Sequence, residues 1–243
     1  MNKASKTAPT GEIFWPRLIP ATLIRRYQRF LTDVRLKDGS EVTAHCPNSG
    51  RMLACCEPGR PVYLSCHDNP KRKLKYTWEL IMMPASLVGV NTLVPNRLVF
   101  QSILAGKIDA FDGYPEVSRE VNIGNGSRLD LLLKRGNGEG CYVEVKNCTL
   151  VEEGIARFPD AITSRGRKHL RELQKLKAGG ARCVMFFLIQ RMDATLFKPA
   201  DRIDPDYGRE LRKAIDKGVE ILVYDVKIDL KRIVLNKEIP FQL

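Results

Sequence analysis

Two short runs in the second half of the chain decide its fold: Arg128-Leu-Asp-Leu-Leu-Leu133 and Cys141-Tyr-Val-Glu-Val-Lys146, joined by the turn-rich segment Arg135-Gly-Asn-Gly-Glu-Gly140. Every second residue of the first run is leucine, and valine alternates with charged residues in the second. Because successive side chains of a strand point to opposite faces, this alternation predicts two strands that each bury one face. The glycine-rich segment between them predicts the turn of a hairpin.

The hairpin gathers three charged side chains on one face. A hairpin folded about Asn137 places Asp130 across from Glu144, and Lys146 shares their face. Two such carboxylates hold a divalent cation such as Mg²⁺ or Mn²⁺, and the lysine orients an attacking water or offsets phosphate charge. We therefore predict Asp130, Glu144 and Lys146 as catalytic residues, with both carboxylates as metal ligands. The alternative is a solvated strand face with a cross-strand ion pair, which this short motif does not exclude.

A third carboxylate would strengthen the metal site by adding charge and oxygen ligands. Glu116 and Glu120 lie just before the hairpin, in or beside the strand expected over residues 117–123, where both would share one face. Glu120 is nearer to the hairpin, so we expect it to be the additional metal ligand. The alternative is a plain surface charge.

Charge indicates the class of partner. The 243 residues carry a formal net charge of +12, with 40 Lys and Arg against 28 Asp and Glu. A strong positive excess favours polyanions such as nucleic acid, although it also serves general solubility. No sugar-binding or cofactor motif is found, which makes a plain enzyme of sugar metabolism the weakest interpretation.

Cysteine usage and hydropathy indicate the compartment. The seven cysteines are odd in number and show no C-x2-C spacing, which argues against a zinc ribbon or a disulfide scaffold. No run of about 18 apolar residues could span a membrane, and the N-terminus lacks the apolar region of a signal peptide. We expect a cytoplasmic protein with reduced thiols that does not bind membranes.

The pattern along the chain predicts two domains after a disordered arm over residues 1–12. Residues 13–92 read as a small β-barrel, with an SH3-like barrel as the nearest alternative. Residues 93–243 read as a mixed α/β sheet flanked by helices, with the boundary within residues 91–96. The strands expected in the barrel cover residues 21–28, 31–36, 41–46, 61–66, 77–83 and 87–91.

Two basic segments of the barrel are candidates for phosphate contacts. The stretch over residues 69–78 holds four cations beside aromatic residues, a combination typical of barrels that bind nucleic acid. Its Trp78 is better explained as a core residue. The polar turn over residues 45–51 presents Arg51 and backbone N–H groups, although simple turn chemistry also explains it. The predicted contacts are Arg51, Lys71, Arg72, Lys73 and Lys75.

The helix expected over residues 161–177 carries a second set of candidates. Arg167, Arg171 and Lys175 recur at every fourth position and form one basic stripe, either beside the carboxylates or as a solvated face. We include Arg167, Lys168 and Arg171 among the nucleic-acid contacts. Lys168 and His169 are weaker candidates for auxiliary groups at the site, and Asp160 is expected to cap the helix.

The chain resembles the sugar fermentation stimulation protein A (SfsA) family over nearly its whole length. The matching stretches include His45-Cys-Pro-Asn-Ser-Gly-Arg51-Met, Asn69-Pro-Lys-Arg-Lys73, Ser127-Arg-Leu-Asp130, Tyr142-Val-Glu-Val-Lys146, Phe158-Pro-Asp-Ala161 and Arg165-Gly-x-Lys168-His-Leu-Arg-Glu-Leu173. The resemblance implies an OB-fold N-terminal domain and a C-terminal domain of the PD-(D/E)XK nuclease fold. It also implies sequence-tolerant DNA binding in bacteria and a regulatory role in maltose metabolism.

Two functions remain open from the sequence. The first is a non-catalytic DNA-binding protein or regulator linked to sugar metabolism, with RNA as an alternative partner. The second is an active nuclease that uses Mg²⁺ or Mn²⁺ at the hairpin. A nuclease-like core can be kept as a binding scaffold, because fold does not fix function.

Overall fold

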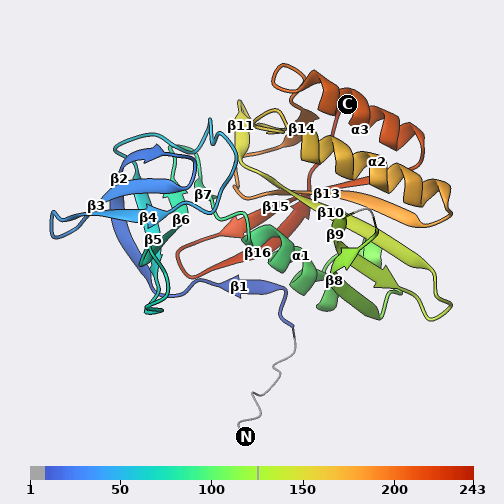
Figure 1. Cartoon of the computed structure of the whole chain (residues 1–243), viewed down its shortest axis with the longest axis horizontal. Helices are drawn as coiled ribbons and strands as arrows, with labels where there is room; N and C mark the ends of the chain where they lie inside the picture. The colour runs from blue at the N-terminus through green and yellow to red at the C-terminus, as the bar shows by residue number, and fades with distance from the viewer. Residues whose placement is uncertain (1–8, 125) are drawn as a thin grey trace, which may run out of the picture.

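The computed structural model describes residues 9–124 and 126–243 and contains two domains that lie side by side (Figure 1). Residues 1–8, most of the arm expected to be disordered, lie outside the described residues. No helix in the described part of the chain combines the length and apolar character needed to cross a bilayer.

The N-terminal domain is a closed five-stranded barrel with one added strand. Its sheet order is β4-β3-β2-β5-β6-β7, and a parallel pairing of β4 with β6 closes the ring. Trp78 is fully buried in its core and donates its indole N–H to the Leu80 carbonyl, so its expected core role is confirmed. The strands are β2 (Leu18–Tyr27), β3 (Leu31–Leu36), β4 (Glu41–His45), β5 (Pro61–Cys66), β6 (Tyr76–Met82) and β7 (Leu87–Gly89).

The C-terminal domain is built on a seven-stranded mixed sheet of order β1-β16-β15-β13-β10-β9-β8. The three central strands β10, β13 and β15 run parallel to one another, and the outer pairings are antiparallel. These strands are β1 (Glu12–Phe14), β8 (Glu116–Asn122), β9 (Arg128–Lys134), β10 (Gly140–Cys148), β13 (Arg182–Ile189), β15 (Glu220–Ile228) and β16 (Arg232–Glu238).

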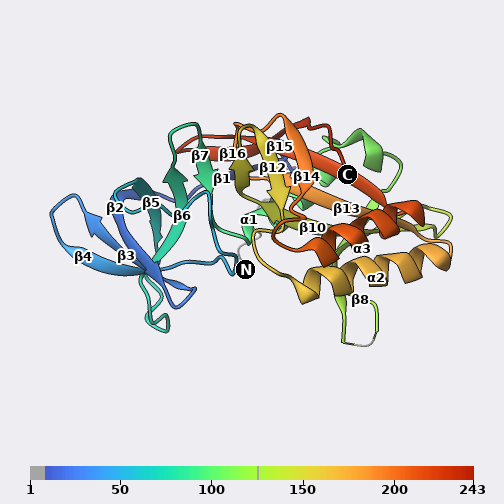
Figure 2. The ribbon, with the colours of Figure 1, turned by 90° about the horizontal axis from the view of Figure 1, so that it is seen from above.

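Helices cover both faces of this sheet. The helix α1 (Val94–Leu104) lies on one face, where Leu98 joins a core cluster with Val143 of β10. The helices α2 (Ser164–Ala178) and α3 (Pro205–Asp216) lie side by side on the other face (Figure 2), where Leu170 packs in a cluster with Met185. A small sheet of β11 (Leu150–Glu152), β12 (Ile155–Phe158) and β14 (Leu196–Pro199) completes the domain, and the expected mixed sheet flanked by helices is confirmed.

Strand β1 corrects the expected start of the barrel. Residues 12–14, assigned to the end of the arm and the start of the barrel, pair with β16 of the C-terminal sheet, with Ile13 opposite Ile233. Both side chains are buried in the core under α1. From β1 in the C-terminal domain, the chain crosses to the barrel near residue 18 and returns at α1.

Asp160 joins the domains and does not cap α2. Its Oδ2 accepts the backbone N–H of Met52 in the barrel at 2.9 Å. The cap of α2 is Thr163, whose hydroxyl accepts the N–H of Gly166 at 3.0 Å. The expected capping role was wrong because the helix begins at Ser164, too far along the chain for Asp160 to reach its free N–H groups.

The contact at Asp160 leaves no room for a side chain at residue 50. A Cβ atom built on Gly50 would lie 2.4 Å from Oδ2 of Asp160. Gly50→Ala therefore forces the carboxylate off Met52 or separates the domains, and we expect a loss of about 1–3 kcal/mol in the free energy of unfolding. Thermal melts of purified protein measure it. Gly136→Ala is the matched control, because nothing lies within 4 Å of its Cβ position. Equal melting temperatures for the two variants would contradict this packing.

Candidate functional site

The carboxylates of the hairpin meet where β9 and β10 separate. The strands pair from Gly140 opposite Lys134 to Val143 opposite Leu131, a register centred on Asn137 as expected. One step further the backbone ladder stops, and Oδ2 of Asp130 accepts the N–H of Val145 at 2.8 Å. The side chain thus replaces a backbone partner, which opens the sheet and brings Asp130 next to Glu144.

Glu144 is buried on the α2 side of the sheet, where two nitrogen atoms hold one of its oxygens. Oε1 accepts a hydrogen bond from Nζ of Lys146 at 2.5 Å and also contacts Nδ1 of His169 on α2. Lys146 Nζ and His169 Nδ1 are themselves 3.3 Å apart. The other carboxylate oxygen, Oε2, is buried and has no hydrogen-bond partner among the described residues.

Asp130 is held in place from α1. Its Oδ1 accepts a hydrogen bond from the side-chain amide of Asn96 at 2.6 Å, while Oδ2 is held by Val145. Each carboxylate oxygen offers two lone pairs, so both atoms keep one free. The Asp130 carboxylate is therefore fixed in orientation and still able to bind a ligand.

The two carboxylates have opposite electrostatic environments. Burial, together with the negative charge of Glu144, raises the pKa of Asp130 to about 7. Burial also opposes ionisation of Glu144, but the charge of Lys146 and the contact with His169 outweigh it and lower the pKa of that carboxyl. Glu144 is ionised at neutral pH, whereas Asp130 is only partly ionised there. Such a pair is typical of functional sites.

These groups fit a divalent cation. A buried carboxylate oxygen without a partner is costly unless an ion, a water or a ligand satisfies it. Oε2 of Glu144 is such an atom, and Asp130 adds a second hard oxygen donor beside it. The described residues contain no group of three or more His, Cys, Asp or Glu side chains that could hold a metal ion. A cation here would therefore take two protein carboxylates and complete its shell with water or substrate oxygens.

Glu120 does not join this pair. The pairing of β8 with β9 skips residue 120, between Arg119 opposite Leu131 and Val121 opposite Leu129. Glu120 has φ = 53°, in the left-handed region, and its exposed side chain lies 3.8 Å from Arg128. The expected third ligand was placed by strict alternation along an extended strand, and the backbone at residue 120 departs from that extended conformation although the register on either side is unbroken.

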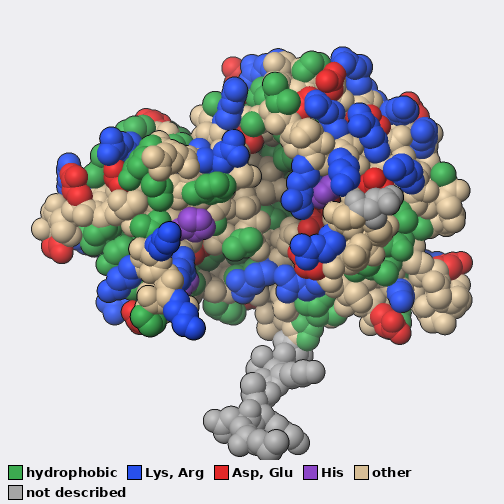
Figure 3. Space-filling model, viewed as in Figure 1, with side chains coloured by type: hydrophobic (Ala, Val, Ile, Leu, Met, Phe, Trp, Pro, Cys, Tyr) green, Lys and Arg blue, Asp and Glu red, His purple; other side chains and the backbone are tan. Residues whose placement is uncertain are grey.

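The carboxylates open into a cleft between the domains, with a volume of about 510 Å³. The barrel contributes Arg29 and the turn Asn48–Gly50, and the C-terminal domain contributes β10 and the N-terminus of α2. Arg26 holds the turn in place by donating to the carbonyls of Asn48 and Gly50. Figure 3 shows the hollow between the domains with Lys and Arg side chains on both of its sides. We call this hollow, with Asp130 and Glu144 in its wall, the interdomain cleft.

None of the five barrel residues predicted to contact nucleic acid lines the interdomain cleft, and four of them are exposed. Arg51 follows the turn of the interdomain cleft and is exposed. Lys71, Lys73 and Lys75 are exposed in the loop before β6, and Arg72 is half-buried and donates to the Thr77 hydroxyl. Their role in binding stays a prediction.

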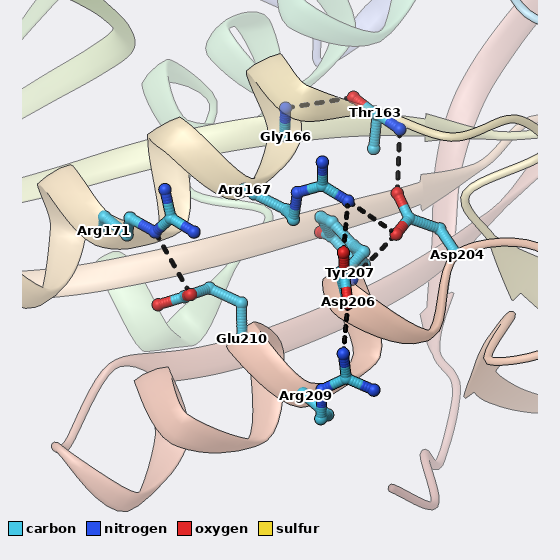
Figure 4. A network of polar contacts seen from close by, with 9 residues as sticks. All are labelled: Thr163, Gly166, Arg167, Arg171, Asp204, Asp206, Tyr207, Arg209 and Glu210. Atoms are coloured by element: carbon cyan, nitrogen blue, oxygen red, sulfur yellow. Dashed lines mark hydrogen bonds and ion pairs between the residues drawn. The ribbon is translucent and has the colours of Figure 1, made fainter.

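The basic stripe on α2 faces α3 rather than the carboxylates. Figure 4 shows Arg167 between Asp204 and Asp206, at 3.0 and 3.4 Å, and Arg171 beside Glu210 at 3.2 Å. Acidic side chains of α3 thus offset much of this charge. The sequence left two placements open for this stripe, beside the carboxylates or on a solvated face, and Arg167 and Arg171 instead form ion pairs with acids in and before α3. Their role in binding stays a prediction. Lys168 is exposed on the same helix.

Two residues that support the site were missed or undervalued. Asn96 was not among the predicted site residues, and nothing in its local pattern points to Asp130, which lies 34 positions further on. His169 was a weak auxiliary candidate, yet it is buried and contacts Glu144 directly. The signal in the sequence that could have identified it is the position of this histidine next to the apolar face predicted for the helix.

A closed barrel joined to an α/β domain, with a carboxylate pair and a lysine where two strands separate, defines the class of fold to which this protein belongs. Family models identify the particular branch. The description "SfsA N-terminal OB domain" matches residues 24–90, and "Sugar fermentation stimulation protein RE domain" matches residues 93–232. The chain belongs to the sugar fermentation stimulation protein family.

Individual relatives agree over the full length of the fold. A sugar fermentation stimulation protein homolog of Geobacter sulfurreducens is 55% identical over 223 residues, which cover 92% of this chain and 95% of that protein. A homolog of Acidithiobacillus ferrooxidans is 51% identical over 226 residues, covering 93% and 97%. The solved structure of Pyrococcus furiosus SfsA in complex with Ca²⁺ superposes with a TM-score of 0.87 at 27% identity, over 95% of this chain and 98% of that one.

The raised pKa of Asp130 predicts a pH-dependent stability. Between the unfolded value of 3.8 and the folded value of about 7, the folded state holds a proton that the unfolded state lacks, so the Asp130 contribution to stability falls as pH rises and is lowest above pH 7. The full difference corresponds to at most about 4 kcal/mol. Without divalent cations, Asp130→Asn should therefore raise the melting temperature more at pH 8 than at pH 5, by on the order of 5 °C.

Glu139→Gln is the control for this measurement, because Glu139 is an exposed acid on the same hairpin. It should shift the melting temperature little at either pH. If Asp130→Asn raised the melting temperature equally at pH 5 and pH 8, Asp130 would be an ordinary ionised carboxylate.

Proposed function

We propose that this protein binds nucleic acid in the interdomain cleft and hydrolyses phosphodiester bonds with Mg²⁺ or Mn²⁺ held by Asp130 and Glu144. The observation that carries the proposal is the unpartnered, buried Oε2 of Glu144 beside a second carboxylate that is only partly ionised at neutral pH. Lys146 contacts only Oε1 of Glu144, and a divalent cation would supply the missing partner for Oε2 and favour the ionised form of Asp130.

Each residue of the site has a distinct task in this proposal. Asp130 and Oε2 of Glu144 would hold the cation, which when bound would stabilise charge on the phosphate and lower the pKa of an attacking water. Lys146 is fixed by Glu144 at 2.5 Å, so its ammonium is positioned to orient that water or to offset phosphate charge. His169 contacts Glu144 from α2 and holds the carboxylate in its orientation, acting as a positioning residue.

The cleft offers groups that suit a phosphate backbone. Arg29, Arg157 and Arg165 line it, and so does the N-terminus of α2, whose free N–H groups favour anions. The net charge of +12 adds a long-range attraction that steers polyanions. We propose DNA as the substrate, with RNA as the alternative.

The relative from Pyrococcus furiosus supports a cation site of this kind, because its structure was determined in complex with Ca²⁺. Ca²⁺ and Mg²⁺ are both hard cations that take carboxylate oxygens. In the protein described here, Glu144 and Asp130 are the natural ligands, and the absence of a third acid among the described residues leaves open positions for water and phosphate.

That same scarcity of acids favours a second candidate, a nucleic-acid-binding protein that does not cleave. Two carboxylates hold a cation less tightly than three, and a retained nuclease-type core can serve as a binding scaffold. In this form the protein would act as a regulator linked to maltose metabolism. For either function we propose the cytoplasm as its compartment, because its seven cysteines carry free thiols.

Cleavage assays separate the two candidates. Labelled single- and double-stranded DNA and RNA are incubated with Mg²⁺ or Mn²⁺, and products are resolved on gels. We expect Asp130→Asn and Glu144→Gln each to lower the cleavage rate about 100-fold or more, because each removes a metal ligand. Glu120→Gln is the matched control and should keep nearly the wild-type rate. No cleavage of any substrate by the wild type would favour the regulator.

Charge reversal tests the predicted barrel surface. Changing Lys71, Arg72 and Lys73 to Glu should weaken DNA binding at least tenfold. It should also lower the slope of log K against log salt by up to about 3, because fewer counterions are released from the DNA when phosphate contacts are lost. Fluorescence anisotropy over a salt series measures both quantities. Reversal of Lys213, Lys217 and Lys227, three exposed lysines on other elements, is the control. Equal effects of the two triple variants would show that only net charge matters.

A further inference from the structure

A second hollow adjoins the interdomain cleft, between the barrel and the start of the C-terminal domain. Its walls include Phe14, His45, His67, Arg72, Glu79 and Leu93. We call it the histidine pocket. None of these residues belongs to the carboxylate site, so the pocket has no part in the hydrolysis described above.

The two hollows share a thin wall. In each of the neighbouring pairs Pro47-Asn48, Thr92-Leu93 and Asn96-Arg97, one residue lines the interdomain cleft and the other lines the histidine pocket. Consecutive Cα atoms are 3.8 Å apart, and a nucleic-acid strand in a duplex advances about 3.4 Å per nucleotide. The Asn96 amide also contacts Asp130 at 2.6 Å. A strand with a phosphate at Asp130 would therefore bring a nearby nucleotide to the pocket.

The rim of these hollows is unusually apolar. Among the described residues, the three most exposed large hydrophobic side chains are Ile162 at 69%, Leu93 at 67% and Phe14 at 64%. Ile162 lines the interdomain cleft, and Leu93 and Phe14 line the histidine pocket. Single exposed apolar residues are common, but their concentration at two adjoining hollows indicates a surface that is covered by a ligand.

The floor of the pocket is polar and fixed. Glu79 is buried and accepts hydrogen bonds from the hydroxyl of Ser65 at 2.6 Å and from the amide of Asn91 at 2.8 Å. Arg72 is anchored on Thr77 at 2.8 Å. A carboxylate offers about four acceptor positions, so Glu79 can still accept from the amino group of a base. The apolar rim suits the faces of an aromatic ring, and the polar floor suits the polar edge of that ring. The adjacent arginine suits a phosphate attached to it.

We propose that the histidine pocket receives an unstacked base of the nucleic-acid strand that occupies the interdomain cleft. Leu93, on the wall between the two hollows, separates this base from its neighbour, and Phe14 provides an apolar surface for it. Arg72 and Arg97 contact the adjoining phosphates. The protein thus selects single-stranded or locally opened nucleic acid over a closed duplex. This inference rests on the proposed nucleic-acid binding and adds the form of the substrate.

The pocket is tested by removing bases from the oligonucleotide and by removing the side chain of Phe14 or Leu93 from the protein, separately and together. A labelled single-stranded oligonucleotide is compared with one of equal length that carries abasic residues, so that the phosphate charge stays the same. Binding is measured by fluorescence anisotropy with Ca²⁺ as the cation. For the wild type, loss of the bases should lower affinity about tenfold, whereas for Phe14→Ala and Leu93→Ala the drop should be less than about threefold. Leu104→Ala, an exposed leucine at the far end of α1, should behave like the wild type.

The outcomes distinguish this inference from the proposed function. A full, wild-type drop in affinity on base removal for both Phe14→Ala and Leu93→Ala would overturn the base pocket and leave nucleic-acid binding intact. Tighter binding of the wild type to a closed duplex of the same length than to the single strand would overturn it as well. Failure of the wild type to bind any nucleic acid would overturn both.

Discussion

The hydrogen bond from the Val145 N–H to the Asp130 carboxylate is the contact on which the site depends. It takes the place of a backbone pairing where the β9–β10 ladder stops, and it holds Asp130 beside Glu144, which is buried. In this arrangement the pKa of Asp130 is raised to about 7, and one carboxylate oxygen of Glu144 has no hydrogen-bond partner among the described residues. A cation bound between the two carboxylates, as proposed here, would favour the ionised form of Asp130 and supply a partner for the free oxygen of Glu144.

The two domains contribute different parts of one surface. The C-terminal sheet supplies the carboxylates and Lys146, while the barrel closes the cleft with the turn Asn48–Gly50. Asp160 joins that turn to the C-terminal domain through Met52, and its carboxylate fills the space beside Gly50. The barrel is therefore more than an attached binding module, because its turn forms one wall of the interdomain cleft.

Much of the fold and the centre of the site could be predicted from the sequence. Alternating leucines and valines predicted the hairpin and its centre at Asn137, because such a pattern depends only on residues close together in the sequence. What failed depended on contacts between distant segments. Strand β1 is three residues long and has a partner more than 200 positions away, and Asp160 is used by the barrel rather than by α2. Glu120 was misplaced because its backbone is left-handed (φ = 53°), whereas the prediction assumed the extended conformation of a regular strand.

The most direct test of the central claim is the binding of Mn²⁺ in solution, measured by titration calorimetry or by electron paramagnetic resonance. The account predicts a Mn²⁺ site in the wild type that is lost in Asp130→Asn and in Glu144→Gln and is kept in Glu120→Gln. Binding that is unchanged in the first two variants, or lost in the third, would contradict it.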